Sequence, residues 1–370
     1  MKFSIPCSEL KTGLQKVISV IPTKTTLPIL GHILFEARNG QLTLTTTDLE
    51  VTLKTQVQAT IESEGSVTIP GRLIFDVVRE LPDIPLNIVK DENNRIVLTF
   101  SKNKYSFFGE DANNYPKLPA IDVKYEITFD KKKLKRYVEK TVFATSTDEL
   151  RPALMGVLFQ VGENDYKAVS TDGHRLVKII DKSFKAQSPI EDVIVPVKAL
   201  NLLLKNIEGD EDIKISFAAN YIVFDLESAS ISATLIEGKY PDYDKVIPIN
   251  EHKKLIIDRE KFISSLRTIS VLANKITQQI KINLEPDKII ITSEDMDLGE
   301  GIEIIEAEYT GEQMEIGFNS NYLLDILTHL DSENVIFTFN TSVSATLVFP
   351  ITQEENEDIL MLVMPIKLKD

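Results

Sequence analysis

Apolar positions along the chain follow two spacings, which predict strands and helices in turn. An alternating stretch at residues 2–5 precedes a segment in which Leu10, Leu14 and Val17 recur at intervals of three or four residues. Alternation is typical of a strand with one buried face, and the longer interval is typical of an amphipathic helix. The chain therefore begins with a predicted strand, followed by a predicted helix over residues 8–21.

This strand–helix pattern occurs three times. It returns as YEITF at 125–129, before a helical segment that contains Leu134, and as KLIID at 254–258, before a helical segment that contains Phe262. The equivalent positions Leu10, Leu134 and Phe262 lie 124 and 128 residues apart. A repeat of this length is too long for a solenoid unit, so we expect each copy to be a domain.

A second marker has the same period. A strand, a helix and another strand are predicted around Pro70, Pro196 and Phe318, which lie 126 and 122 residues apart. Alternating segments that are typical of antiparallel hairpins fill the rest of each copy. We therefore predict an α+β fold of three repeated domains, each with two helices and antiparallel sheets. Proline-containing segments place the boundaries at 1–120, 121–249 and 250–370.

Composition narrows the class of protein. With 43% hydrophobic and 26% charged residues, the chain has the composition of a folded globular protein. Its one cysteine, Cys7, excludes an internal disulfide, and its four histidines lack the spacing of zinc ligands. No apolar signal segment precedes Cys7, and no run approaches the roughly 18 apolar residues of a membrane span. We expect a cytoplasmic protein with no metal, no cofactor and no membrane partner.

The distribution of charge bears on possible partners. The net charge of −15, taken alone, disfavours nucleic acid. Basic residues nevertheless gather in five of the six predicted helices, whereas the acidic excess lies in turns and strands. Solvated helix faces are the plain explanation, and a basic surface that meets phosphate groups is the alternative. The basic residues of the predicted helices are Lys11, Lys16, Arg72, Arg79, Lys132, Lys133, Arg136, Lys140, Lys198, Lys205, Lys261 and Arg267.

Repeated domains of this kind can close into a ring with their helices inside. Twelve helices from two chains, spaced roughly 8–10 Å apart, would form a circle roughly 30–38 Å across. After about one helix diameter of 10–12 Å is subtracted, a hole wide enough for a DNA duplex remains.

Six ordered motifs then resemble those of a known family, the bacterial DNA sliding clamp or beta subunit of DNA polymerase III. The resemblance covers essentially the whole chain. The motifs are TLPILGHILFEA (26–37), TTTDLEV (45–51), VSTDGHRLV (169–177), GKYPDYDKVIP (238–248), MEIGFNSNYLLDIL (314–327) and VMPIKL (363–368).

The resemblance implies a head-to-tail homodimer of three clamp domains per chain, which closes into a ring with helices lining a pore around duplex DNA. It implies a DNA polymerase processivity factor with no enzymatic activity. Its partners would be non-specifically encircled duplex DNA, the replicative polymerase, the clamp loader and other clamp-motif proteins. Proteins would bind through one hydrophobic peptide pocket per chain, lined by Leu154, Thr171, Gly173, His174, Arg175, Leu176, Pro241, Lys245, Val246, Asn319, Tyr322, Val343, Val363, Met364 and Pro365.

Two further sets of residues are carried over by position from the resemblance. The DNA-contact residues are Lys24, Arg72 and Lys198. The dimer joint would bring Lys102, Lys104, Tyr105 and Phe107 of one chain to Val271, Leu272, Glu303 and Glu306 of the next.

The sequence also departs from the family pattern. Lys245, Ala345, Ile366 and Lys367 stand where Arg, Ser, Met and Arg are common, and Pro152-Ala153 stands where some relatives place aromatic residues that touch DNA. These differences bear on peptide preference, because Lys lacks the planar fork of Arg.

Two other functions account for parts of the sequence. Asp172 and His174 could form an acid/base pair of an enzyme, but no nucleophile or phosphate-binding loop accompanies them, and Asp-Gly between two strands is typical of a hairpin turn. The net charge would also suit an acidic scaffold that binds proteins and never DNA.

Overall fold

The computed structural model describes residues 1–249, 252–295 and 297–368. The chain forms two compact units, which comprise residues 1–135 with 198–235, and residues 136–197 with 236–370. Each unit therefore contains part of the predicted repeat 121–249. The boundaries of the three repeats remain a prediction.

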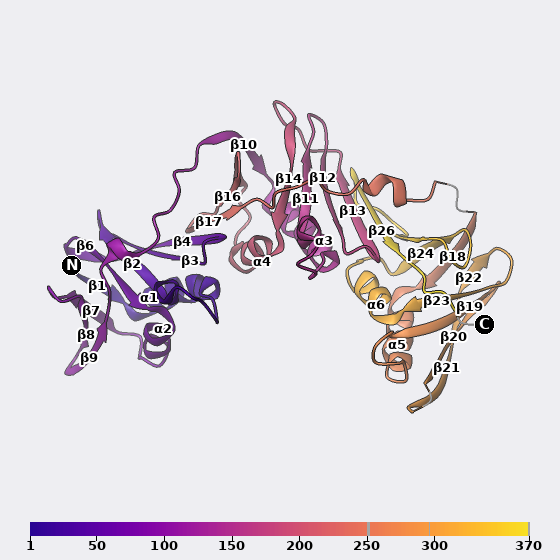
Figure 1. Cartoon of the computed structure of the whole chain (residues 1–370), viewed down its shortest axis with the longest axis horizontal. Coiled ribbons are helices and arrows are strands. Elements are labelled where there is room, and N and C mark those ends of the chain that lie inside the picture. Colours follow the sequence, from indigo (N-terminus) through magenta and orange to yellow (C-terminus); the bar gives the residue numbers. More distant parts are fainter. Residues whose placement is uncertain (250–251, 296, 369–370) are drawn as a thin grey trace. The chain divides into compact units, whose positions relative to one another are not determined.

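Six α-helices occur in the described ranges, two in each predicted repeat, as expected (Figure 1). They are α1 (Cys7–Val17), α2 (Gly71–Arg79), α3 (Lys131–Thr141), α4 (Val197–Asn206), α5 (Arg259–Ser270) and α6 (Ser320–Thr328). The apolar stripe that predicted α1 is fully buried at Leu10, Leu14 and Val17. The carboxylate of Asp258 accepts the backbone N–H of Lys261 and so caps the start of α5. Burial of one face, and not helix propensity alone, accounts for these short helices.

The first unit has two antiparallel sheets. The five-stranded sheet has the order β5 (Thr60–Ser63), β1 (Lys2–Pro6), β7 (Pro85–Lys90), β8 (Arg95–Phe100) and β9 (Asn103–Phe108). The eight-stranded sheet has the order β10 (Val123–Phe129), β15 (Ile213–Ala218), β16 (Tyr221–Asp225), β17 (Ala229–Thr234), β4 (Val51–Gln58), β3 (Gln41–Thr47), β2 (His32–Arg38) and β6 (Gly65–Pro70).

The second unit is built in the same way. Its nine-stranded sheet has the order β14 (Ile190–Pro196), β11 (Gly156–Val161), β12 (Tyr166–Thr171), β13 (Arg175–Asp181), β26 (Glu357–Val363), β25 (Thr346–Pro350), β24 (Asn334–Phe339), β18 (Lys253–Asp258) and β22 (Glu308–Thr310). Its four-stranded sheet has the order β21 (Gly299–Glu306), β20 (Lys288–Asp295), β19 (Gln279–Glu285) and β23 (Met314–Asn319).

Strand pairing joins neighbouring repeats within each unit. In the first unit β17 pairs with β4, so that Ile231 lies opposite Leu53. In the second unit β13 pairs with β26, so that Arg175 lies opposite Val363. Each junction therefore has a continuous ladder of backbone hydrogen bonds, which leaves no exposed strand edge at that place.

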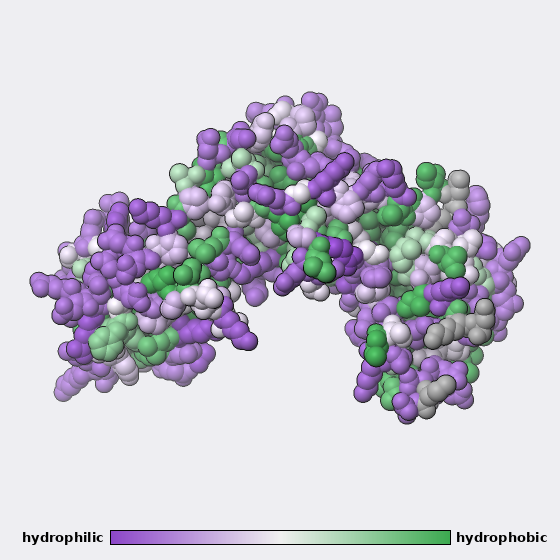
Figure 2. Space-filling view, viewed as in Figure 1, coloured by the Kyte–Doolittle hydropathy of each residue, from purple (hydrophilic) through white to green (hydrophobic). Residues whose placement is uncertain are grey.

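The face of the molecule in Figure 2 is mostly polar. Figure 2 shows hydrophilic residues over most of the visible face, with hydrophobic residues in small separate groups. Isolated apolar residues of this kind are normal on a soluble surface, so larger conclusions require specific contacts. Among the described helices, none is long and apolar enough to cross a membrane.

Candidate functional site

The residues of the predicted pocket all lie in the second unit, in loops and at the ends of strands. They come from η5 (Pro152–Met155), the β12–β13 turn, the segment through η6 (Tyr243–Val246), the β23–α6 junction, the loop before β25 and the end of β26. The backbone N–H of Met364 donates to the carbonyl of His174 over 2.8 Å, which ties the C-terminal segment to the β12–β13 turn. Segments far apart in sequence therefore meet at this place, as the prediction requires.

The turn at 172–174 is held by its own side chains. The Asp172 carboxylate accepts the backbone N–H groups of His174 (2.8 Å) and Arg175 (3.0 Å). The Thr171 hydroxyl donates to the carbonyl of Arg175 and accepts the N–H of Gly173, whose φ of +92° favours glycine. The predicted hairpin turn is confirmed. The hydrogen bonds of the Asp172 carboxylate hold the turn, which removes the support for an acid/base pair with His174.

Arg175 lies between aromatic rings and carboxylates. Its Nε donates to Asp172 Oδ2 (3.1 Å), its Nη2 donates to the carbonyl of Phe143 (2.8 Å), and its Nη1 donates to the Asp325 carboxylate. The guanidinium carbon lies 5.3 Å from the ring centre of Phe143 and 4.9 Å from that of Tyr322. Such charge-assisted bonds are among the stronger ones in proteins, so Arg175 is firmly held.

The rings of His174 and Tyr322 stack with their centres 5.8 Å apart. Asn319 places Tyr322 by capping α6, because its side-chain oxygen accepts the backbone N–H groups of Asn321 (2.9 Å) and Tyr322 (3.4 Å). Burial raises the pKa of the Tyr322 hydroxyl, and the nearby Asp172 carboxylate acts in the same direction. His174 is exposed and Tyr322 is half-buried, so this stack presents one aromatic surface to solvent.

The predicted apolar residues divide into two groups. Leu176 and Val363 are 1% and 0% exposed, so these two are core residues of the folded chain. Val246 and Val343 are 54% and 62% exposed, and Met364 is also exposed. Leu154 and Leu176 belong to a buried cluster with Leu158, Val169, Ile194, Tyr240, Tyr243, Leu347 and Leu362. Exposed apolar side chains in segments that also supply this buried cluster suit the docking of a small apolar anchor.

The charged group nearest to Val246 in sequence is Lys245. Its ammonium group forms an exposed ion pair with Asp242 over 2.8 Å, and the hydrogen bond that it donates to this carboxylate raises the pKa of Lys245. Exposed pairs of this kind contribute little to stability. Lys245 can therefore exchange Asp242 for another acidic group at small cost.

The basic residues predicted to contact DNA lie in the first unit, in three different environments. Lys24 is exposed, and Arg72 is exposed with one weak hydrogen bond to the carbonyl of Ile21 (3.4 Å). Lys198 forms an ion pair with Asp48, whose carboxylate is 8% exposed. An internal carboxylate therefore already balances the charge of Lys198, and its contact with DNA stays a prediction.

Helix α3 looks strongly basic in the sequence, but much of its charge is also matched internally. In the first unit Lys131 donates to the carbonyl of Glu208 (2.7 Å), and Lys132 pairs with Asp210 (3.1 Å). In the second unit the partners come from the third repeat. Arg136 contacts Asp331 and the buried Glu357 (3.0 Å), and Lys140 donates to Asp331 (2.6 Å). Among the described helices, exposed cations for which no carboxylate partner is described include Lys135 on α3 itself, and Arg72, Lys205, Lys261 and Arg267.

Burial raises the pKa of Asp331, but hydrogen bonds from Lys140 and Arg136 outweigh it, so that the pKa lies below its ordinary value. The carboxylate is therefore favoured in the folded chain, and it stabilises the fold wherever it is ionised.

The residues predicted at the dimer joint lie on edge strands, at β9 in the first unit, and at β21 and the end of α5 in the second. Tyr105 and Val271 are exposed, but Phe107 is only 4% exposed and packs inside its own sheet. Phe107 therefore offers little surface to a partner chain, whereas its neighbour Phe108 is 79% exposed, and the place of Phe107 at the joint stays a prediction. Ile302 and Ile304 on β21 are also exposed, and no sequence pattern singled out these two residues or Phe108.

The remaining joint residues are polar or partly covered. Lys102, Lys104 and Glu306 are exposed, Leu272 is half-buried, and Glu303 accepts a hydrogen bond from the Ser265 hydroxyl (3.0 Å).

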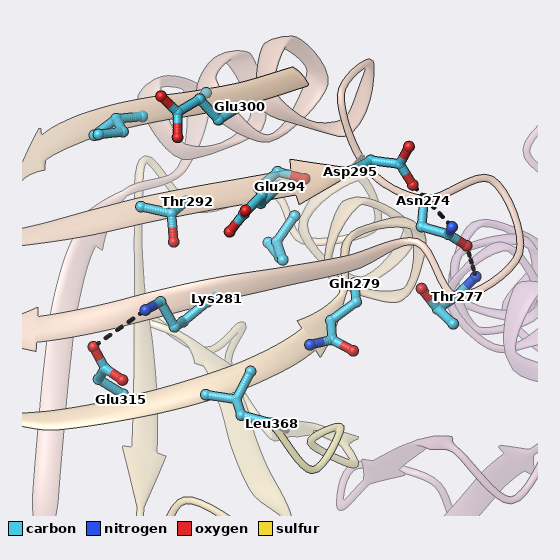
Figure 3. Close-up of a pocket in the computed structure, with 14 residues that line it drawn as sticks. Asn274, Thr277, Gln279, Lys281, Thr292, Glu294, Asp295, Glu300, Glu315 and Leu368 are labelled. Carbon is cyan, nitrogen blue, oxygen red and sulfur yellow. Dashed lines mark hydrogen bonds and ion pairs between the residues drawn. The ribbon is translucent and has the colours of Figure 1, made fainter. Parts of the chain in front are cut away.

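A groove of about 740 Å³ lies on the four-stranded sheet of the second unit (Figure 3). Lys281 on its wall pairs with Glu315 (3.4 Å), and Asn274 donates to Asp295 (2.9 Å). Leu368 of the C-terminal segment completes the lining, but none of the predicted pocket residues does. The groove is thus separate from the predicted pocket, and no motif indicated it because its residues come from several strands.

No group of three or more His, Cys, Asp or Glu side chains in the described ranges converges to hold a metal ion. The arrangement offers apolar, aromatic and charged surfaces for binding.

Comparisons with known proteins agree along the whole chain. Residues 1–119, 128–242 and 244–367 match, in order, the N-terminal, central and C-terminal domains of the DNA polymerase III beta subunit. The beta sliding clamps of Chlamydia muridarum and Escherichia coli are each 30% identical, over 100% of both chains.

Solved structures give the same result. The sliding clamp of Bacillus subtilis has a TM-score of 0.94 at 26% identity, and that of Pseudomonas aeruginosa bound to griselimycin has 0.92 at 30% identity. Both matches cover 100% of this chain and of the other.

Proposed function

Because the chain belongs to the family of DNA polymerase III beta subunits, the beta sliding clamps, we propose that it is the processivity factor of a replicative DNA polymerase. It encircles duplex DNA without sequence preference and tethers the polymerase to it. The observation that carries the proposal is the ordered match of all three family domains to nearly the whole chain. Tethering a polymerase requires no catalysed reaction. A protein that binds chromosomal DNA in a bacterium would be located in the cytoplasm.

The ring would consist of two chains joined head to tail. Support comes from charge at two edge strands. Lys102 and Lys104 are exposed beside or on β9, and Glu300 and Glu306 are exposed on β21. An edge strand offers unpaired backbone groups, so a basic edge and an acidic edge on two copies can pair in one relative direction. Exposed Phe108, Ile302 and Ile304 offer apolar area to such a joint, and Val271 lies beside it.

Contact with DNA would be loose. Lys24 and Arg72 are available for phosphate groups, whereas Lys198 must first leave Asp48. Phosphate contacts of this kind position a protein without reading bases, and they weaken as salt rises. Such contacts suit a ring that slides.

Client proteins would dock at the predicted pocket of the second unit. A short extended peptide would set a leucine or phenylalanine anchor against Val246, Val343 and Met364, above the buried cluster. Methionine at the rim adapts to anchors of different shape, which suits one site that serves the polymerase, the clamp loader and other clients.

Primer extension with the cognate polymerase and clamp loader tests this function. We expect long products from single binding events with the intact chain, and short products when residues 364–370 are removed. Product length that does not depend on this protein would contradict the proposal and would leave an acidic scaffold as the better explanation.

A further inference from the structure

We propose that Arg175 is a positioning residue of the client-peptide site, and that Asp325 on α6 holds it in place. The inference rests on the proposed peptide site and names residues that keep this site in shape. Asp325 is not among the pocket residues that the family resemblance implies.

The first observation is that Arg175 has little capacity left for a ligand. A guanidinium group donates from a planar edge and stacks on two faces. Here three of its five N–H groups are engaged by Asp172, Asp325 and the carbonyl of Phe143, and the rings of Phe143 and Tyr322 lie near the guanidinium group. The side chain is 11% exposed. Most of the donors of Arg175 are therefore committed within the chain, and little of the side chain is left for a peptide to contact.

The second observation is that the partners of Arg175 also fix the position of His174 and of helix α6. The Asp172 carboxylate binds Arg175 through one oxygen and fixes the backbone of His174 through the other. Tyr322, against which Arg175 lies, also stacks on His174. Asp325 is one helical turn beyond Tyr322 on α6, so its bond to Arg175 ties this helix of the third repeat to the β12–β13 turn of the second.

The third observation is that His174, which stacks on Tyr322, is exposed, whereas the Arg175 side chain is only 11% exposed. The surface offered to a peptide is therefore the aromatic pair, and the ion pairs behind it set the position of that pair. Loss of Asp325 would leave a largely buried cation with one partner fewer, which loosens the turn. The apparent affinity is the intrinsic affinity multiplied by the fraction of molecules in the binding-competent arrangement. If only a tenth of the molecules keep this arrangement, binding is about tenfold weaker.

Calorimetry with a synthetic clamp-motif peptide on the full-length dimer tests the inference. We expect Asp325→Asn to bind about tenfold more weakly than the unchanged chain, with the same mass in sedimentation. If Arg175 contacted the peptide, Asp325→Asn would free its guanidinium, and affinity would stay equal or rise. Either of these results overturns the inference.

The matched control is Asp358→Asn. Asp358 forms an exposed ion pair with Lys182 (2.5 Å) at the far end of β26 from Val363, in the same sheet. Its loss removes one carboxylate from the same unit, and we expect peptide affinity to stay within about twofold, as for an exposed pair.

A double-variant cycle separates positioning from an independent contact. If both residues act through the same arrangement, Arg175→Met with Asp325→Asn binds no more weakly than Arg175→Met alone. Additive losses would mean that Asp325 acts on the peptide by another route, and would contradict the inference.

Two further measurements distinguish positioning from a general loss of stability. In nuclear magnetic resonance spectra of the free protein, the ring signals of His174 should shift in Asp325→Asn, because the stack with Tyr322 changes. Asp325→Glu keeps the negative charge, so this variant should recover part of the His174 signal positions and part of the peptide affinity. It also tests the inference if Asp325→Asn does not fold. Unchanged His174 signals with lower thermal stability would show a structural role only.

The proposed function and the inference fail in different ways. If the unchanged chain does not bind the peptide, the pocket itself is wrong and the inference falls with it. If the unchanged chain binds and Asp325→Asn binds equally well, only the inference is wrong.

Discussion

Neutralising Glu357 should destabilise the second unit measurably. Its carboxylate is 6% exposed and accepts Nε (3.2 Å) and Nη2 (3.0 Å) of Arg136. Removing one partner of a buried ion pair typically costs about 3–5 kcal/mol. Two features reduce this loss. Arg136 keeps Asp331, and Asp181 lies directly opposite Glu357 on β13, so that neutralisation also relieves a repulsion between carboxylates.

We therefore expect Glu357→Gln to lower the free energy of unfolding by about 2 kcal/mol, or the melting temperature by about 4–8 °C for a unit of this size. Differential scanning calorimetry and urea unfolding at neutral pH measure both quantities. Asp358→Asn, one residue along the same strand, removes an exposed pair with Lys182 and should stay within about 0.5 kcal/mol of the unchanged chain. If the two variants are equally stable, the reasoning about burial is refuted.

Three other predictions follow from the site, the joint and the α3 ion pairs. Val271→Asp, at an exposed position of the proposed joint, should give monomers in sedimentation because dimerisation would bury an unpaired charge, and an unchanged dimer mass would reject this joint. Removal of residues 364–370 should abolish binding of a clamp-motif peptide in calorimetry and leave the dimer intact, and unaltered affinity would reject the pocket. Because the pKa of Asp331 is lowered, its contribution is present above about pH 4 and lost as pH falls through the lowered pKa. The loss of stability in Asp331→Asn at pH 7 should therefore disappear at strongly acidic pH in urea unfolding, and a loss independent of pH would show that its charge is irrelevant.

The helices could be predicted from the sequence because the spacing of apolar residues within a helix depends directly on which face is buried. Leu10 and Leu14 recur at the helical interval and are fully buried. The turn at Asp172 and Gly173 could be predicted for a similar reason, since an Asp-Gly pair between two strands determines its own backbone shape.

The ion-pair partners of the charged side chains could not be predicted from local spacing. The partners of Arg136 lie 195 and 221 residues along the chain, at Asp331 and Glu357, and no local pattern indicates them. The partner of Lys198 is likewise distant in the sequence, and the fold brings this lysine to Asp48. Phe107 is a different case, because alternation along β9 assigns Phe107 and Phe108 to opposite faces, but does not say which face is buried.

A ring of two chains around DNA would be retained on circular DNA but not on linear DNA. The protein is loaded onto nicked circular DNA with its clamp loader, free protein is removed, and the DNA is then cut once. A closed ring should stay on the circle through a salt wash and be released by sliding off the ends after cutting. Equal retention on circular and linear DNA, or no retention on either, would contradict the claim.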